Sequence, residues 1–136
     1  GKPPAVQYEA VLSRSVLEKY LESFQATPPR FKFIWLHDKS AKLAAYLGKY
    51  LASAIQANMV CDSVGLDPEV PSKVTKGTLA RAKPRGRWKL ILDAAYKSDK
   101  MPELIHCLMR LARPPREEGD ALATQVTSMR CWARCS

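Results

Sequence analysis

The sequence is poor in the residues that small-molecule chemistry requires. It contains only six glycines and two histidines among 136 residues, and the patterns GxxxxGKS/T, GxGxxG, HExxH and GxSxG do not occur in it. Six glycines are too few for a Gly-rich nucleotide cradle. His37 and His106 have no Ser, Cys or Asp at a spacing known from nucleophilic sites. We therefore expect packing or capping roles for both histidines and predict that the protein is not an enzyme.

Long apolar runs and disulfide patterns are also missing. No run approaches the ~18–20 apolar residues of a membrane-spanning helix, and residues 1–4 lack the hydrophobic region of a secretory signal. The four cysteines are Cys61, Cys107, Cys131 and Cys135. Their spacings do not match the framework of a secreted mini-protein, so we expect reduced, mostly buried thiols. Two cysteines four apart on one helical face do not complete a zinc site, and neither a metal nor a cofactor is predicted.

Acidic residues are in the minority, with 13 Asp and Glu against 22 Lys and Arg, for a net charge of +9. Much of the excess lies in residues 73–89, which contain no acid. Such a stretch indicates an acidic protein surface, a phosphate backbone beside a stacking aromatic residue, or simply a solvated loop. The candidate partner-binding residues are its basic side chains and the adjacent tryptophan: Lys73, Lys76, Arg81, Lys83, Arg85, Arg87 and Trp88.

What the sequence does contain is helical periodicity, and 46% hydrophobic residues are enough for one folded domain over residues 1–136. Residues 1–7 are predicted to form an extended arm, and residues 8–61 the N-terminal helices. Within them, the dense apolar run 30–36 is predicted to be a short buried helix. Asp38 or Ser40 then caps a longer helix that reaches Asn58. Residues 62–86 are predicted to be a long basic linker loop, and residues 87–136 a helical hairpin followed by a last helix that begins near Glu117.

The sequence of the predicted hairpin resembles a known type of helical repeat. Residues 87–111 read RWKLILDAAYKSDKMPELIHCLMRL. This segment resembles one pentatricopeptide repeat, with Trp88 as the aromatic that precedes the first helix, Ala94 and Ala95 as its small-residue pair, and Asp99 at the turn where glycine is usual. The second helix matches through apolar residues and begins with Pro102 in its first turn.

The resemblance implies an all-α fold of stacked antiparallel hairpins, a short solenoid with a long basic loop. The family usually binds single-stranded RNA in mitochondria and plastids, but Lys89 stands where the family reads a base with Asn, Thr or Ser. The resemblance therefore implies a non-catalytic accessory subunit of a large mitochondrial complex, on the matrix side, that docks onto other protein subunits. The first expectation is the ATP synthase, since the chain is similar in size class and repeat content to a small accessory subunit on the catalytic head of the euglenozoan enzyme. The alternative is an RNA-binding or mitochondrial ribosomal protein that uses residues 73–89.

Overall fold

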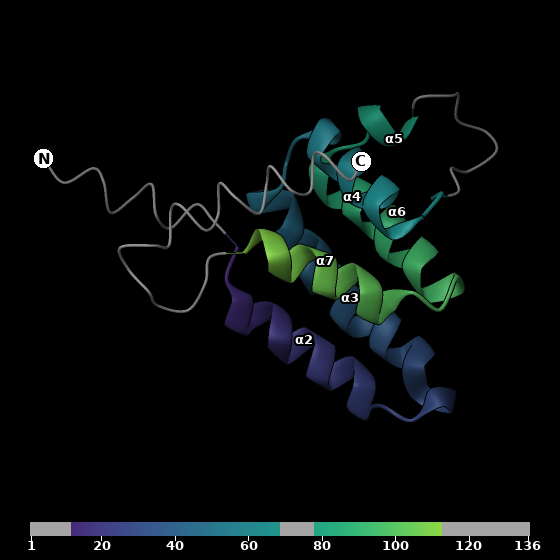
Figure 1. The fold of residues 1–136 in the computed structure, drawn as a ribbon. Coiled ribbons are helices and arrows are strands. Elements are labelled where there is room, and N and C mark those ends of the chain that lie inside the picture. The colour runs from purple at the N-terminus through teal and green to yellow at the C-terminus, as the bar shows by residue number, and fades with distance from the viewer. Residues whose placement is uncertain (1–11, 69–77, 113–136) are drawn as a thin grey trace, which may run out of the picture.

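The computed structural model describes residues 12–68 and 78–112, and these residues form an all-α fold, as the sequence predicts (Figure 1). Five helices of 11 to 19 residues pack together: α2 (Arg14–Ala26), α3 (Lys32–Tyr50), α4 (Ala54–Val64), α6 (Pro84–Lys97) and α7 (Met101–Leu111). A 3-10 turn, η1 (Pro29–Phe31), leads into α3, and a single-turn helix, α5 (Thr78–Arg81), precedes α6. No helix within the described ranges is both long and apolar enough to cross a bilayer.

Side-chain caps determine where two of the helices begin. The Ser13 hydroxyl accepts a hydrogen bond from the Val16 amide at 3.5 Å, at the start of α2. The Ser53 hydroxyl accepts bonds from the Ile55 and Gln56 amides at 3.1 and 3.4 Å, at the start of α4. Such caps satisfy amides that have no partner within the helix. A serine before an apolar stretch therefore positions each of these helices.

The expected boundaries around α3 were wrong in two respects. The run 30–36 is not a separate short helix, because α3 continues from Lys32 to Tyr50 without a break. Ser40 does not cap a helix there; it is buried in the middle of α3, and its hydroxyl donates to the carbonyl of Leu36, one turn earlier. The helix expected to reach Asn58 ends at Tyr50, because Ser53 provides the cap of a new helix.

The expected linker 62–86 is partly helical. Helix α4 extends to Val64 and ends at Gly65, whose φ of 84° suits glycine. Helix α5 lies within the expected loop, and α6 begins at Pro84 instead of Arg87. Proline fits the first turn of a helix because its missing N–H would have no helical partner there. The expected arm 1–7 and the last helix from Glu117 lie outside the described residues.

Helices α6 and α7 form the antiparallel hairpin that the sequence predicts. The turn places Asp99 at a φ of 58°, in the left-handed region that glycine usually occupies. The Lys100 amide closes the turn on the Ala95 carbonyl at 2.7 Å. Pro102 lies in the first turn of α7, as expected. The hairpin itself is therefore confirmed as a pair of helices with a tight turn.

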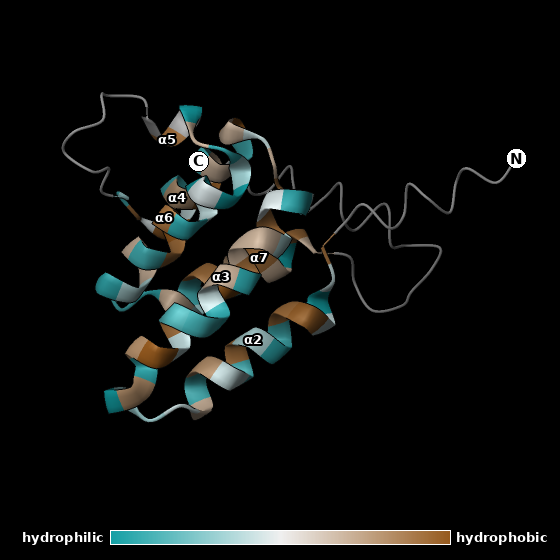
Figure 2. Ribbon diagram, turned by 180° about the vertical axis from the view of Figure 1, so that it is seen from behind, coloured by the Kyte–Doolittle hydropathy of each residue, from teal (hydrophilic) through white to brown (hydrophobic). Residues whose placement is uncertain are grey.

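The helices close into a ring. Helix α2 contacts α3, α3 contacts α6, α6 contacts α7, and α7 returns to α2, while α4 packs on both α6 and α7. An open solenoid leaves its first and last helices apart, whereas here α2 and α7 touch. Hydrophobic residues line the inward faces of the ribbon in Figure 2. The arrangement shows a helical bundle with one covering helix and does not show a pentatricopeptide-type solenoid.

The most extensive contact in the bundle joins α3 and α6, which run in opposite directions. Small residues at every fourth position of α3, namely Ser40, Ala44 and Gly48, allow the close approach. A Cβ atom added to Gly48 would lie 2.9 Å from the backbone nitrogen of Arg85. Because real Cβ atoms do not approach backbone so closely, the contact requires glycine there. Because the end of α3 is held tightly against the start of α6, the direction in which the first turns of α3 run relative to α6 is set as well.

Candidate functional site

The first turns of α3 present large apolar side chains to solvent. Phe33 is 59% exposed, Ile34 is 44% exposed, and Phe31, at the end of η1, is 42% exposed. These side chains follow one another within four residues, so they form one uncovered patch. Single exposed hydrophobic residues are ordinary on a protein surface, but a contiguous group often marks a binding surface.

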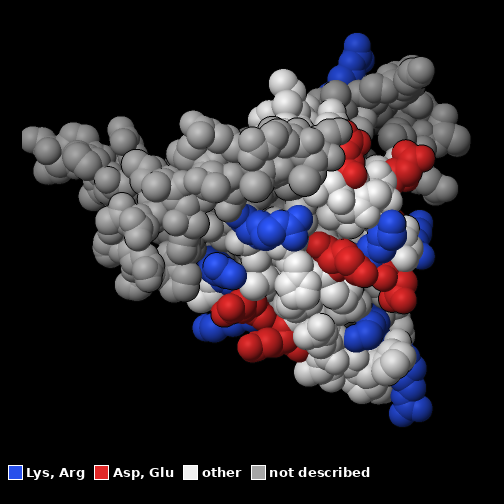
Figure 3. Space-filling model, in the orientation of Figure 1, with Lys and Arg blue, Asp and Glu red and all other residues white. Residues whose placement is uncertain are grey.

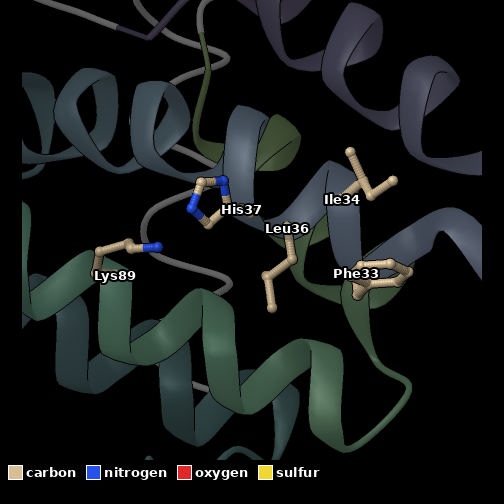
Figure 4. A pocket seen from close by; sticks show the side chains of 5 residues that line it. All are labelled: Phe33, Ile34, Leu36, His37 and Lys89. Carbon is tan, nitrogen blue, oxygen red and sulfur yellow. The ribbon is translucent and has the colours of Figure 1, made fainter.

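Two residues of this patch, Phe33 and Ile34, line one side of a groove between α3 and α6 (Figure 4). Phe33, Ile34, Leu36 and His37 line the groove from α3, and Lys89 reaches it from α6. The groove has a volume of about 500 Å³, and its walls are largely apolar. Figure 4 shows Leu36 directed toward α6 and the Lys89 ammonium lying on the same side as the His37 ring. We call these five residues the α3–α6 groove.

The groove is uncovered because α3 has more apolar residues at its start than one inward face can hold. Trp35 takes the inward position, where it is 3% exposed and its Nε1–H donates to the Ser23 hydroxyl at 2.9 Å. Its ring also meets the Phe24 ring edge-on, with centroids 5.0 Å apart. Neighbours in a helix diverge by about 100° per residue, so Phe33 and Ile34 cannot face the core at the same time as Trp35. They point outward because the interior is already filled.

Lys89 is held at the groove by the buried part of α3. Its ammonium donates to the Ser40 hydroxyl at 3.2 Å, and that hydroxyl in turn donates to the Leu36 carbonyl. Within the described residues, no carboxylate lies within ion-pair distance of Lys89. A lysine ammonium has three donors. One hydrogen bond to a hydroxyl therefore leaves its charge uncompensated and some of its donors available to a ligand.

The chain segment that contains η1 and α3 is basic. Residues 29–50 carry five cations and a single carboxylate: Arg30, Lys32, Lys39, Lys42 and Lys49 against Asp38. His37 accounts for that carboxylate, since its Nδ1 lies 3.0 Å from an oxygen of Asp38. By contrast, basic and acidic side chains are interspersed on the described face shown in Figure 3. The positive excess of the described residues is therefore shared between the η1–α3 segment and residues 81–89, which carry five cations and no carboxylate.

The structure separates the candidate partner-binding residues into three groups. Arg81, Lys83 and Arg85 are exposed, at α5 and at the start of α6. Lys73 and Lys76 lie outside the described residues. Arg87 and Trp88 are 5% and 0% exposed, respectively. These last two side chains belong to the interior and are removed from the set of candidate surface contacts.

Arg87 is buried because its guanidinium fixes the backbone of three segments. It donates to the carbonyls of Leu79 at 3.0 Å, Ala82 at 2.8 Å and Ala52 at 2.7 Å. The five N–H donors of a guanidinium suit such a cluster of carbonyls. Trp88, the next residue, donates its Nε1–H to the Leu51 carbonyl at 2.8 Å. Both residues thus hold the break between α3 and α4 against the start of α6.

The histidines and the described cysteines do not converge. His37 and His106 are both exposed, whereas Cys61 and Cys107 are buried as free thiols. Burial raises the pKa of the Cys61 thiol to about 11, which disfavours the nucleophilic thiolate. Residues 12–68 and 78–112 contain no group of three or more His, Cys, Asp or Glu able to hold a metal ion. Cys131 and Cys135 lie outside these ranges.

Sequence reasoning missed the groove although it singled out the run that forms it. The run 30–36 was interpreted as buried because it is dense in apolar residues. The available signal was the stretch 33–36 within it, because four consecutive apolar residues cover more of a helix than one face. Lys89 could not be assigned to the groove from sequence, since it lies 49 positions from Ser40 along the chain.

No protein family, no curated protein and no solved structure matched this chain in the three comparisons made. The groove is therefore interpreted from its own side chains. Exposed aromatic and aliphatic residues beside unpaired cations are typical of surfaces that other macromolecules cover.

Proposed function

We propose that this chain is a non-catalytic docking subunit whose α3–α6 groove is covered by another protein. The observation that carries the proposal is the exposure of Phe31, Phe33 and Ile34 within four residues of chain, beside a groove with apolar walls. Burying such side chains releases free energy in proportion to the apolar area removed from water. A protein partner supplies the extended apolar surface that covers them.

The assembly we propose is a large mitochondrial complex, on the matrix side, with the ATP synthase as first candidate. The support is the resemblance of residues 87–111 to one pentatricopeptide repeat. Trp88 and Ala95 are both 0% exposed, whereas Ala94, the other residue of the small pair, is half-buried. Short, degenerate repeats of this kind suit a structural subunit better than a protein that recognises the bases of RNA. Lys89, at the base-reading position, is engaged with Ser40 beside the groove.

The test is purification of the tagged full-length chain from its own cells, followed by sizing of the particle. We expect the chain to elute with a large assembly whose other subunits mass spectrometry identifies, and the particle to survive ribonuclease. The double variant Phe33→Ser with Ile34→Ser should elute alone. Ile55→Ser is the matched control, because Ile55 is 71% exposed but lies on α4, outside the groove. If the double variant stays in the particle as well as the control does, the docking proposal is wrong.

RNA binding is the second candidate, and one observation favours it. Arg81, Lys83 and Arg85 are exposed, and Lys73 and Lys76 precede them in the sequence. Cations at the start of α6 oppose the helix dipole, so helix stability does not explain Lys83 and Arg85. A labelled single-stranded RNA, titrated at increasing salt, tests this candidate, because phosphate neutralisation gives a steep loss of affinity with salt. Charge reversal of the three exposed residues should then abolish RNA binding while the Phe33 and Ile34 variants retain it.

A further inference from the structure

We propose that the α3–α6 groove accepts an acidic amphipathic helix of the partner, with a carboxylate of that helix pairing with Lys89. The inference rests on the proposed docking function and specifies the chemistry of the partner segment. The two helices that form the groove determine which shape of partner segment fits, and the charged residues around the groove determine which charge that segment carries.

The shape suits a third helix. The groove lies between α3 and α6, which are antiparallel and closely packed. An amphipathic helix laid into such a groove places apolar side chains at positions i, i+3, i+4 and i+7 along it. Phe33, Ile34 and Leu36 provide the complementary apolar wall over the first turns of α3. An extended strand would need an open sheet edge, and the described residues form helices at the groove.

The charge specifies the polar part of the helix. Lys89 and His37 are the ionisable groups that line the groove, and Lys89 has no carboxylate partner in the described structure. Arg30 lies just before the groove residues in the chain, in η1, with its guanidinium carbon 5.0 Å from the centroid of the exposed Phe31 ring. A partner helix with glutamates or aspartates beside its apolar stripe compensates the charges of Lys89 and Arg30. A basic helix would be repelled by them.

A nucleic acid is a poorer occupant. Single-stranded RNA binds on aromatic platforms flanked by cations, and Phe33 could stack one base. The neighbouring walls come from Ile34 and Leu36, however, which offer neither a stacking plane nor a hydrogen bond. These aliphatic walls favour the apolar side chains of a protein helix.

The experiment uses two synthetic peptides and the full-length chain. Each fluorescein-labelled 18-residue helix carries leucines at i, i+3, i+4 and i+7, flanked by glutamates in one peptide and by lysines in its twin. Fluorescence anisotropy measures their affinities. We expect the acidic peptide to bind more tightly than its twin. Phe33→Ser should weaken it about tenfold, the equivalent of losing one buried side chain.

Charge reversal at Lys89 is the decisive variant. Lys89→Glu should weaken the acidic peptide about fivefold and strengthen the basic twin, because one partly exposed ion pair contributes little more than that. Lys19→Glu is the control, since Lys19 is exposed on α2 and changes the net charge equally. Lys89→Gln keeps a donor for Ser40 and should show the smaller, intermediate loss. Circular dichroism checks that each variant remains helical.

The outcomes separate this inference from the docking proposal. Equal binding of both peptides, or an effect of Lys19→Glu equal to that of Lys89→Glu, would overturn the acidic-helix inference alone. The same holds if neither peptide binds while the native particle still depends on Phe33 and Ile34. If oligouridine binds through Lys89 and Phe33 and the acidic peptide does not, both proposals are overturned in favour of RNA.

Discussion

The two ends of the α3–α6 contact are built in opposite ways. Near the end of α3, Gly48 lies against the backbone of Arg85, and Trp88 is fully buried with its indole nitrogen bonded to a carbonyl. Near the start of α3, by contrast, Phe33 and Ile34 face solvent, and Lys89 has no carboxylate partner in the described residues. We call these regions the sealed end and the open end.

The difference shows which residues stability requires. At the sealed end, apolar area is buried and polar groups are paired, so nearly every atom contributes to folding. At the open end, about half of the surface of Phe33 and Ile34 remains in water, and that half contributes nothing to the folded state. Large apolar surface that does not stabilise the isolated chain is best explained by a partner that covers it. Variants at the two ends should therefore differ in what they change.

The largest effect is expected from Trp88→Ala at the sealed end. Removing this fully buried side chain leaves a cavity and an unpaired Leu51 carbonyl. The free energy of unfolding should fall by about 3–5 kcal/mol, measured by urea denaturation followed by circular dichroism. A loss below about 1 kcal/mol would show that the sealed end is not tightly packed.

Arg87→Met should follow closely. The substitution keeps much of the aliphatic length but leaves the carbonyls of Leu79, Ala82 and Ala52 without their guanidinium donor. We expect the free energy of unfolding to fall by about 2–4 kcal/mol. Arg87→Lys should lose almost as much, because an ammonium does not reproduce the planar fork. Full stability of Arg87→Lys in the same denaturation experiment would contradict a role for that geometry.

A pair of glycine variants sharpens the comparison further. Glycine-to-alanine changes within helices normally stabilise by about 0.5–1 kcal/mol. Gly86→Ala should do so, since nothing lies within 4 Å of the added Cβ. Gly48→Ala should instead destabilise by about 1–3 kcal/mol, because the added Cβ would meet backbone at 2.9 Å. The thermal midpoints of the two variants are measured, and we expect the midpoint to rise for Gly86→Ala and to fall for Gly48→Ala. Changes of the same sign would refute the close approach of α3 to α6 at Gly48.

The smallest effect on stability is expected at the open end. Phe33→Ser and Ile34→Ser replace exposed side chains in a helix by a residue of similar helix propensity. Each should change the free energy of unfolding by no more than about 0.5 kcal/mol. The same variants are expected to abolish docking. A large loss of stability on either substitution would mean that these side chains belong to the core, and the contrast between the two ends would fail.

Several local features could be predicted from particular residues. The all-α class, the helical hairpin of residues 87–111, the tight turn at Asp99 and the role of Pro102 follow from sequence patterns and agree with the structure. That Asp99 stands where glycine is usual was implied by the repeat resemblance alone. The break before Ser53 and the start of α6 at Pro84 had signals in the sequence, a serine cap and a first-turn proline. The prediction nevertheless placed Ser53 inside one long helix and Pro84 inside the linker. Helix boundaries were therefore less predictable than the existence of the helices.

The candidate site was less predictable, because burial is decided by neighbours far away in the chain. Arg87 and Trp88 resembled surface residues because they end a basic stretch, yet carbonyls 35 and 37 positions earlier hold them inside. Phe33 and Ile34 resembled core residues because they belong to a dense apolar run. Helical periodicity and composition show how many apolar residues a segment has. They do not show which of those side chains can be buried in the protein interior.

By itself, the sequence determined that this chain is helical, where its hairpin turns and where its positive charge is concentrated, because periodicity, capping and charge are properties of neighbouring residues. Only the tertiary structure decided that α3 packs on α6 through Gly48, that Arg87 and Trp88 lie inside, and that Lys89 meets an uncovered apolar groove. The physical reason is that close packing fills a limited interior. Which apolar side chains remain outside depends on how all the helices fit together.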